Sequence, residues 1–360
     1  MGPAGETRRV PSDDDLLRTF APVLRYDSRE LYFADSAATI TGNVYDGGPL
    51  RAYANVLRRK DKSVIASASD VLDLDFLGET TYGNGEPVHD GDYLDAATEE
   101  YVADARRMHT DPGNANHIYG VVRPAAGGKK WLQYWFFYYY NDKALVGFGV
   151  HEGDWEGIQI RVDSSGKADA VTFSQHDGGE KAAWSDVELE SGAPVVYVGL
   201  GSHASYLRKG SHKAPLVDDV CDAGGREVRP ELEILSDDFP SWVRWPGRWG
   251  ASPKKGAISF PSPASPRTQR RWHDPDGFHK DARTFKEQRG GADTVPTPPP
   301  VVTASRDADT IKVQVTGADV TAKLVVTATV DGRPEALEYD LNELEGGPAQ
   351  PLRPATNHGG

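Results

Sequence analysis

The chain has 360 residues, of which 38% are hydrophobic and 26% charged, a composition typical of folded globular proteins rather than disordered segments. Its formal net charge of −14 argues against a nucleic-acid partner, because phosphate binding requires concentrated Lys and Arg. The basic runs at 57–60 and 267–271 are therefore interpreted as solvated surface. The single cysteine, Cys221, excludes an intramolecular disulfide and a multi-cysteine zinc site.

Hydropathy along the chain argues against a membrane-spanning helix. No run approaches the roughly 18 consecutive apolar residues that such a helix needs. The first 20 residues contain three arginines but no apolar segment of a secretory signal. We expect a cytoplasmic protein, or one exported without a standard signal peptide.

The predicted elements between residues 1 and 290 are mostly strands. Capping and spacing predict helices at 11–21 and 92–108. Alternating or continuous apolar runs, each closed by Gly, Asn, Asp or Ser, predict strands at 117–124, 130–140, 156–163, 169–176 and 193–201. The spacing predicts a mainly β domain, an antiparallel β-sandwich with a few short helices, that carries the candidate site.

A proline-rich stretch separates this domain from a small C-terminal appendage. Residues 291–302 hold four prolines in five positions, which predicts a stiff extended linker. Two short strands at 310–317 and 322–332 predict a small β module over 303–345, and 346–360 reads as a flexible tail.

The stretch "GVHEGDWEGIQIRV" at 149–162 poses a physical problem. Asp154 and Glu156 share the parity of Ile158 and Ile160, so a regular strand points two carboxylates toward an apolar face. A buried carboxylate needs a cation, hydrogen-bond donors or a proton. A bound metal ion would compensate both charges.

Other polar residues also follow apolar runs. If neighbouring strands are antiparallel, alternate ends meet at one edge and these loops converge. Carboxylates with one imidazole favour Mg²⁺ or Ca²⁺, or else Mn²⁺, whereas two or three histidines favour zinc or iron. The alternative is that the histidines bond to backbone at strand ends and that Ser202 and His203 form a turn. The candidates are Asp142, His151, Asp154, Glu156, His176 with Asp177, and His203.

Six motifs in order resemble the vacuolar protein sorting-associated protein sixty-two family. They cover most of residues 15–280 and leave out the appendage. The family name reflects a trafficking phenotype and implies no biochemical activity. The motifs are "FAPVLRYDSRELYFADS" (20–36), "YWFFYYYND" (134–142), "HEGDWEGIQI" (151–160), "SQHDGG" (174–179), "VVYVGLGSHASY" (195–206) and "WPGRWG" (245–250).

A more distant resemblance is to the necrosis-inducing (NLP) cytolysins, whose Gly-His-Arg-His-Asp-Trp-Glu heptapeptide follows an aromatic strand on a β-sandwich. This chain keeps His-x-x-Asp-Trp-Glu, and the resemblance implies that His151, Asp154, Glu156 and the upstream Asp142 hold a divalent cation. "SQHDGG" is similar to a Ser-x-His-Gly stretch of those toxins. Gly153 replaces their second histidine and the disulfide is missing, so membrane lysis is not implied.

Three functions follow as hypotheses. The first is a divalent-metal-dependent binding protein for a glycan, glycolipid or membrane head group. Its ligand would stack on tryptophans, unless these only fasten a loop to the sandwich. The second is a metal-assisted hydrolase of an ester, phosphodiester or glycoside, with His176 or His203 as general base. The third is a non-catalytic trafficking or effector module with a structural metal, whose appendage binds a protein partner. We favour the first. The tryptophans are Trp184, Trp242, Trp245 and Trp249.

Overall fold

The structure is a computed structural model in which the chain divides into two compact units, Met1–Arg289 and Gly290–Gly360. The first unit ends beside the predicted boundary at residue 290. In the second unit the structure describes backbone only. The described residues are 11–41, 55–67, 72–96, 99–110, 116–142, 150–176, 178–213, 218–235, 240–251, 262–285, 301–307, 310–316, 323–330 and 333–340.

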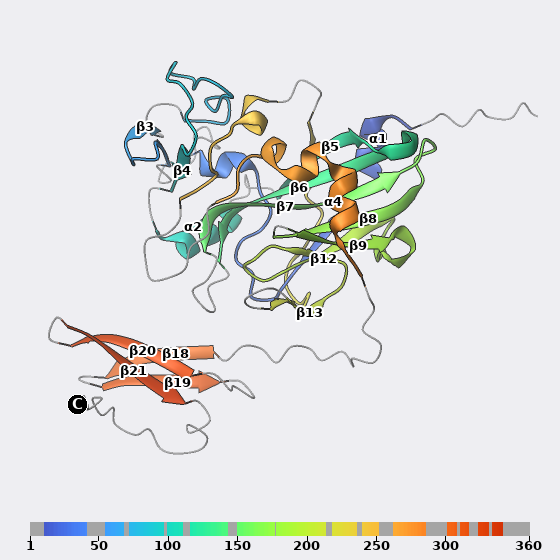
Figure 1. The fold of residues 1–360 in the computed structure, drawn as a ribbon. Helices are drawn as coiled ribbons and strands as arrows, with labels where there is room; N and C mark the ends of the chain where they lie inside the picture. The colour runs from blue at the N-terminus through green and yellow to red at the C-terminus, as the bar shows by residue number, and fades with distance from the viewer. Residues whose placement is uncertain are drawn as a thin grey trace, which may run out of the picture. The chain divides into compact units, whose positions relative to one another are not determined.

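A seven-stranded sheet forms the centre of the first unit (Figure 1). Its strand order is β16-β5-β6-β7-β8-β9-β17, and the four pairings from β5 to β9 are antiparallel. The edge strand β16 pairs in parallel with β5, and the edge strand β17 pairs in parallel with β9. Parallel pairing is possible here because the two strands of each pair come from distant parts of the chain. The strands are β5 (His117–Pro124), β6 (Lys130–Asn141), β7 (His151–Val162), β8 (Ala168–Gln175), β9 (Gly178–Ala183), β16 (Glu231–Ile234) and β17 (Arg283–Thr284).

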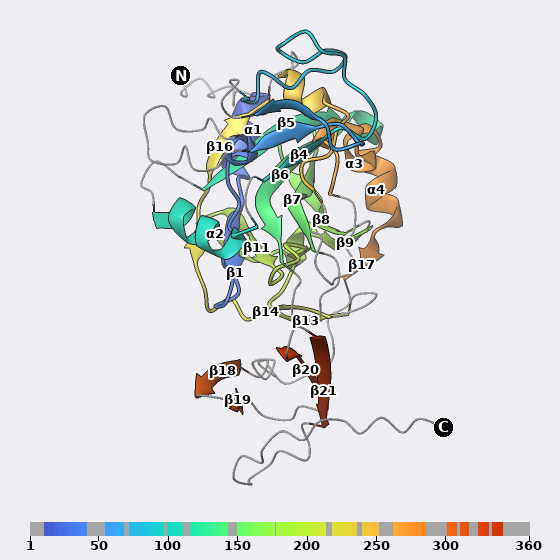
Figure 2. The ribbon, with the colours of Figure 1, turned by 90° about the vertical axis from the view of Figure 1, so that its left-hand side faces the viewer.

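A smaller sheet packs against one face of the first (Figure 2). Its order is β10-β11-β1-β15, with β12 also paired to β11, and the central β1 and β11 run parallel. The two facing sheets confirm the predicted β-sandwich. The strands are β1 (Val23–Tyr26), β10 (Leu189–Glu190), β11 (Ala193–Val198), β12 (Ser205–Tyr206) and β15 (Glu227–Val228).

Short elements complete the described part of this unit. The helices are α1 (Asp13–Thr19), α2 (Tyr101–Thr110), α3 (Arg270–His273) and α4 (Pro275–Asp281), with 3-10 turns η1 (Ala37–Ile40), η4 (Ala126–Gly128), η6 (Trp184–Asp186), η7 (Ser241–Arg244) and η8 (Pro266–Thr268). The remaining strands are β2 (Val56–Arg58), β3 (Val64–Ser67), β4 (Tyr93–Asp95), β13 (Gly210–His212) and β14 (Asp219–Cys221).

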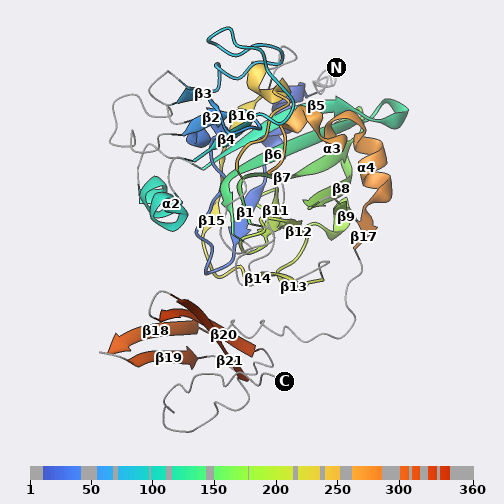
Figure 3. The same cartoon turned by 60° about the vertical axis from the view of Figure 1, so that its left-hand side comes forward.

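Each face of the large sheet has its own apolar core. Even-numbered side chains of β6 and β7, such as Tyr134 and Ile158, pack between the sheets with Val196 of β11. Odd-numbered side chains, such as Trp135 and Trp155, pack beneath 242–249 and α3, on the side where Figure 3 shows α3 and α4. Both faces of β6 and β7 are therefore buried, and the charged side chains at the strand ends need a separate explanation.

The predicted elements agree with the structure in most places and differ at their ends. The helix expected over 92–108 begins only at Tyr101, because Tyr93–Asp95 pairs with β2 and buries Leu94 completely. Tertiary pairing overrides helical spacing there. Strand β7 begins at His151 rather than residue 156. Among the described residues, no helix is long and apolar enough to cross a membrane.

The second unit contains two strand pairs. Strands β18 (Val301–Asp307) and β19 (Thr310–Thr316) form one antiparallel pair, and β20 (Lys323–Val330) and β21 (Arg333–Asp340) form the other. Strand β18 begins at Val301, so residues 301 and 302 of the range predicted as linker, 291–302, belong to a strand. Residues 291–300 and 346–360 lie outside the described residues.

Candidate functional site

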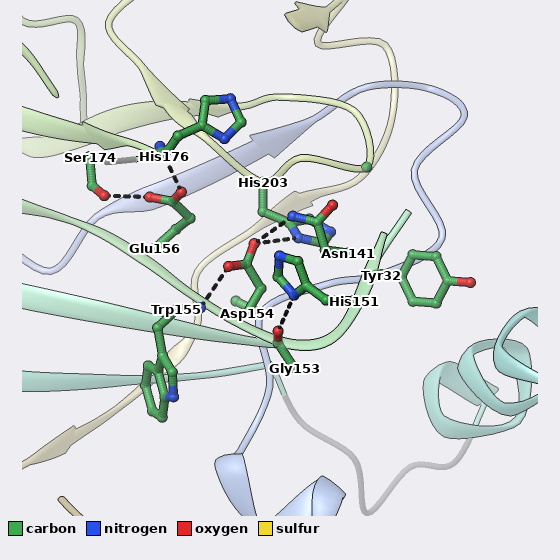
Figure 4. Close-up of polar contacts among 12 residues, drawn as sticks. Tyr32, Asn141, His151, Gly153, Asp154, Trp155, Glu156, Ser174, His176 and His203 are labelled. Atoms are coloured by element: carbon green, nitrogen blue, oxygen red, sulfur yellow. Dashed lines mark hydrogen bonds and ion pairs between the residues drawn. The ribbon is translucent and has the colours of Figure 1, made fainter. Parts of the chain in front are cut away.

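Three strand ends of the large sheet meet at one edge, as expected from antiparallel pairing. Asn141 at the end of β6 lies opposite His151 at the start of β7, and β8 ends nearby at Gln175, before His176. Asp154 pairs across from Tyr138 and therefore faces the small sheet, as predicted from its parity. Figure 4 shows these side chains at the edge.

Asp154 is almost fully buried and is held by three donors. Its Oδ2 accepts hydrogen bonds from Asn141 Nδ2 and from Nδ1 of His203, both at 3.2 Å, and its Oδ1 accepts one from the backbone N–H of Trp155 at 2.9 Å. Burial alone would raise the pKa of Asp154. The hydrogen bond from His203 and the charges of His151 and His203 outweigh it and lower that pKa.

His203 lies between two carboxylates in the interior. The ring stacks on Tyr138 with centroids 4.0 Å apart and planes 5° apart. Its Nε2 is 3.8 Å from Glu30 Oε1 and makes no hydrogen bond to the described residues. Burial lowers the pKa of His203, but Asp154 and Glu30 more than offset this and raise it to about 9. The imidazole is therefore charged at neutral pH.

The carboxylate of Glu156 has its own hydrogen-bond donors and a nearby cation, separate from those of Asp154. Its Oε2 accepts a short hydrogen bond from the hydroxyl of Ser174, and its Oε1 accepts one from the backbone N–H of His176 at 3.2 Å. Arg271 Nη1 lies 3.9 Å from Oε2. Burial, with the nearby charge of Asp154, raises the pKa of Glu156 to about 7.

Arg271 corrects one expectation. It belongs to the basic run 267–271, interpreted above as solvated surface, yet it is buried. Its guanidinium carbon lies 3.8 Å from the ring centroid of Trp135, and Nη2 donates to the carbonyl of Trp155 at 2.8 Å. Burial lowers the pKa of Arg271 to about 10, still well above neutral. A basic run can thus contain one inward-facing residue where a helix crosses a sheet.

His151 is held by the backbone beside it. Its Nδ1 lies 2.7 Å from the carbonyl oxygen of Gly153, so Nδ1–H donates, and in the neutral ring Nε2 carries the lone pair. The opposite residue, Asn141, has a buried amide oxygen with no hydrogen-bond partner among the described residues. His151 and Asn141 therefore add one nitrogen and one oxygen acceptor beside Asp154 (Figure 4).

The remaining predicted residues lie at the margins of this group. Asp142 follows β6 and is half-buried; burial, with the charge of Asp142, raises the pKa of Tyr32 and Tyr140. His176 turns toward the other side, where its Nε2 is 3.0 Å from Asp219 Oδ2. Asp177 lies outside the described residues.

The described residues do not form a complete set of charged metal ligands. Nowhere in the described ranges do three Asp, Glu, His or Cys side chains lie together as they would around a metal ion. The structure brings together Asp154 and His151 with Asn141, while Glu156 is engaged elsewhere. The ligand set Asp142, His151, Asp154 and Glu156 stays a prediction.

Glu30 was not singled out from the sequence, although it lies within the first motif. It is buried, and its Oε1 accepts from the backbone N–H groups of Leu31 and Tyr32, both at 2.9 Å. Its Oε2 accepts from the N–H of Gly201 at 2.7 Å. In the sequence, the position of Glu30 beside apolar residues of the motif is the only local sign that its carboxylate is buried and bonded to backbone N–H groups.

The tryptophans are mostly core residues. Trp242 and Trp249 are buried against Trp155 on the outer face of the large sheet, and Trp245 is buried against Trp249, which corrects the suggestion that they stack on a ligand. Trp184 is half-buried and packs edge-to-face on Phe20. The alternative, in which the tryptophans of 242–249 fasten a loop to the sandwich, is what the structure shows.

Comparison with known proteins supports the motif-based resemblance. Residues 87–214 match the family described as Vacuolar protein sorting-associated protein 62. The predicted family resemblance is confirmed. The matched segment contains β5 to β13 and all six predicted site residues, from Asp142 to His203. No curated protein matches the chain.

Similar solved structures are NLP proteins. The non-toxic HaNLP3 protein is 12% identical, with a TM-score of 0.37, and the match covers 79% of this chain and 98% of that one. NLPPya in complex with mannosamine is 12% identical, with a TM-score of 0.35 and coverages of 79% and 95%. Necrosis and Ethylene inducing Protein 2, from the causal agent of cocoa's Witches Broom disease, is 16% identical, with a TM-score of 0.31 and coverages of 63% and 76%. These low TM-scores and identities transfer no function to this chain.

Proposed function

We propose that the chain is a divalent-metal-dependent binding protein that recognises a glycan, glycolipid or membrane head group. The supporting observation is the orientation of His151 beside Asp154. A histidine that ligates a metal usually donates its other ring N–H to a carbonyl or carboxylate, which fixes the tautomer. The hydrogen bond from Nδ1 of His151 to the Gly153 carbonyl is of this kind.

The acceptors at the edge suit a hard or intermediate cation. They comprise Nε2 of His151, the carboxylate of Asp154 and the amide oxygen of Asn141, with Asp142 adjacent in sequence. Such a mixture favours Mg²⁺ or Ca²⁺, with Mn²⁺ or Zn²⁺ as alternatives. An ion held by so few protein ligands would keep water in its other positions, which hydroxyl or phosphate oxygens of a ligand could occupy instead.

The test measures metal and ligand binding together. Calorimetry with Mg²⁺, Ca²⁺ and Mn²⁺ should show one site in the wild type and at least about tenfold weaker binding in His151→Ala. The exposed histidine His273 provides the matched control, and His273→Ala should bind as the wild type does. Glu156→Gln should weaken binding less than His151→Ala, because the oxygens of Glu156 already have partners.

Ligand recognition is then tested with a glycan array and with phosphatidylcholine vesicles, with or without a glycosylated lipid. Binding should disappear in excess chelator and return when the cation is restored. Equal binding in the presence and absence of chelator would contradict the metal role. Retention of the ion by His151→Ala would contradict the assignment of His151.

The alternatives gain less support. A general base must be neutral and reach its substrate, whereas His203 is fully buried and its pKa is raised to about 9. His176 is more exposed and stays the candidate base of the hydrolase hypothesis. A protein partner for the appendage stays a prediction.

A further inference from the structure

A buried chain of three side chains lies behind the edge. Asp154, His203 and Glu30 follow one another across the space between the sheets, with separations of 3.2 Å and 3.8 Å. All three side chains are at most one-tenth exposed. Asp154 also accepts a hydrogen bond from Asn141 at the edge, so it links His203 and Glu30 to the edge.

The loop that carries His203 is built to hold this ring in place. His203 has a φ of 55°, a left-handed conformation that is uncommon for residues other than glycine. Its backbone N–H donates to the carbonyl of Gly199 at 2.9 Å. Glu30 fixes the same loop through the N–H of Gly201. Tyr138 covers one face of the ring.

Glu30 also joins this loop to the segment that leaves β1. One carboxylate binds backbone N–H groups of Leu31 and Tyr32 with one oxygen and that of Gly201 with the other. The segment after β1 and the loop after β11 are therefore tied at the position of His203. The orientation of the imidazole, and through it that of Asp154 Oδ2, depends on this tie.

We propose that His203 and Glu30 are positioning residues that hold the Asp154 carboxylate in the orientation required for cation binding at the sheet edge. This inference rests on the proposed function. His203 donates to Oδ2, while Oδ1 has one backbone donor and retains lone-pair capacity. Without the donor from His203, only Asn141 holds Oδ2 and the carboxylate is freer to rotate.

The experiment compares Mn²⁺ dissociation constants of the full chain, measured by the electron paramagnetic resonance signal of free Mn²⁺. His203→Leu keeps an apolar contact with Tyr138 but removes the donor, and its dissociation constant should rise about 10- to 100-fold, as for lost outer-shell partners of metal ligands. His203→Asn places an amide donor near the position of Nδ1 and should stay within about threefold of the wild type. The rescue by Asn separates donation from packing.

Glu30→Gln provides an independent variant that keeps the shape of the side chain. A single amide oxygen cannot accept from both sides of the tie, so the Mn²⁺ dissociation constant should rise by less than in His203→Leu but measurably. Melting temperatures in chelator report any purely structural loss. The order of the variants by melting temperature should differ from their order by Mn²⁺ affinity.

The outcomes separate the two proposals. Mn²⁺ binding by the wild type, with unchanged dissociation constants in His203→Leu and Glu30→Gln, overturns the positioning role and leaves the metal site standing. Equal losses in His203→Asn and His203→Leu, in step with their melting temperatures, also overturn it. A wild type that binds no Mn²⁺, Mg²⁺ or Ca²⁺ overturns both proposals.

Discussion

Gly153 occupies the position where the NLP heptapeptide carries a second histidine, and the structure gives a physical reason for glycine. Its φ is 57°, and a Cβ there would lie 2.2 Å from the carbonyl oxygen of Trp249. The neighbouring Gly250 would in turn place a Cβ 2.3 Å from the carbonyl oxygen of Glu152. The start of β7 and the segment after Trp249 thus pass each other with backbone in contact.

Gly153→Ala should destabilise the fold by about 2–4 kcal/mol. The left-handed backbone accounts for about 1 kcal/mol, and overpacking against a backbone atom that cannot rotate away adds about 1–3 kcal/mol. Gly192 is the matched control, because its φ is 87° but a Cβ there meets nothing within 4 Å. Gly192→Ala should therefore lose only the backbone contribution of about 1 kcal/mol.

Urea unfolding of both variants and the wild type measures the difference directly. The free energy of unfolding should fall more in Gly153→Ala than in Gly192→Ala, with a similar dependence on urea concentration. Gly153→His should lose at least as much as Gly153→Ala, since it adds the same Cβ. Equal losses in Gly153→Ala and Gly192→Ala would refute the close backbone contact.

Two further predictions concern the titratable side chains of His279 and Arg271. Burial, with nearby positive charges, lowers the pKa of His279 from 6.5 to about 4. Between about pH 6.5 and about pH 4 the unfolded chain therefore binds a proton at His279 that the folded chain does not bind. The free energy of unfolding falls as the pH falls through this range. His279→Gln, which can still bond Thr172, should lose less stability than the wild type between about pH 7 and about pH 5 in urea unfolding; an identical pH dependence contradicts this. Arg271→Leu should destabilise by about 3 kcal/mol because it leaves Glu156 buried without a cation. Adding Glu156→Gln should recover part of that loss in a double-mutant cycle, and strict additivity would show that the two charges do not interact.

Local periodicity predicted the strands of the large sheet and the face of β7 that carries Asp154 and Glu156, because alternation is a property of neighbouring residues. It could not predict Arg271 as the partner of Glu156, since that contact spans 115 positions and depends on where α3 crosses the sheet. For the same reason the pairing of β4 with β2 was missed. Glu30 was missed because a buried acid bonded to backbone N–H groups leaves no spacing pattern.

The hydrogen-bond and ion-pair partners of Asp154 and Glu156 change the reason for expecting a metal. A cation was first inferred to compensate two buried carboxylates, yet Asp154 has the charged His203 and Glu156 has donors and Arg271 nearby. The protein therefore supplies the compensation that folding requires. Beside Asp154, the contacts of the described residues leave two acceptors at the edge unused, Nε2 of His151 and the amide oxygen of Asn141. Acceptors without donors favour a cation more specifically than buried acids do, because acids can be satisfied by the chain itself.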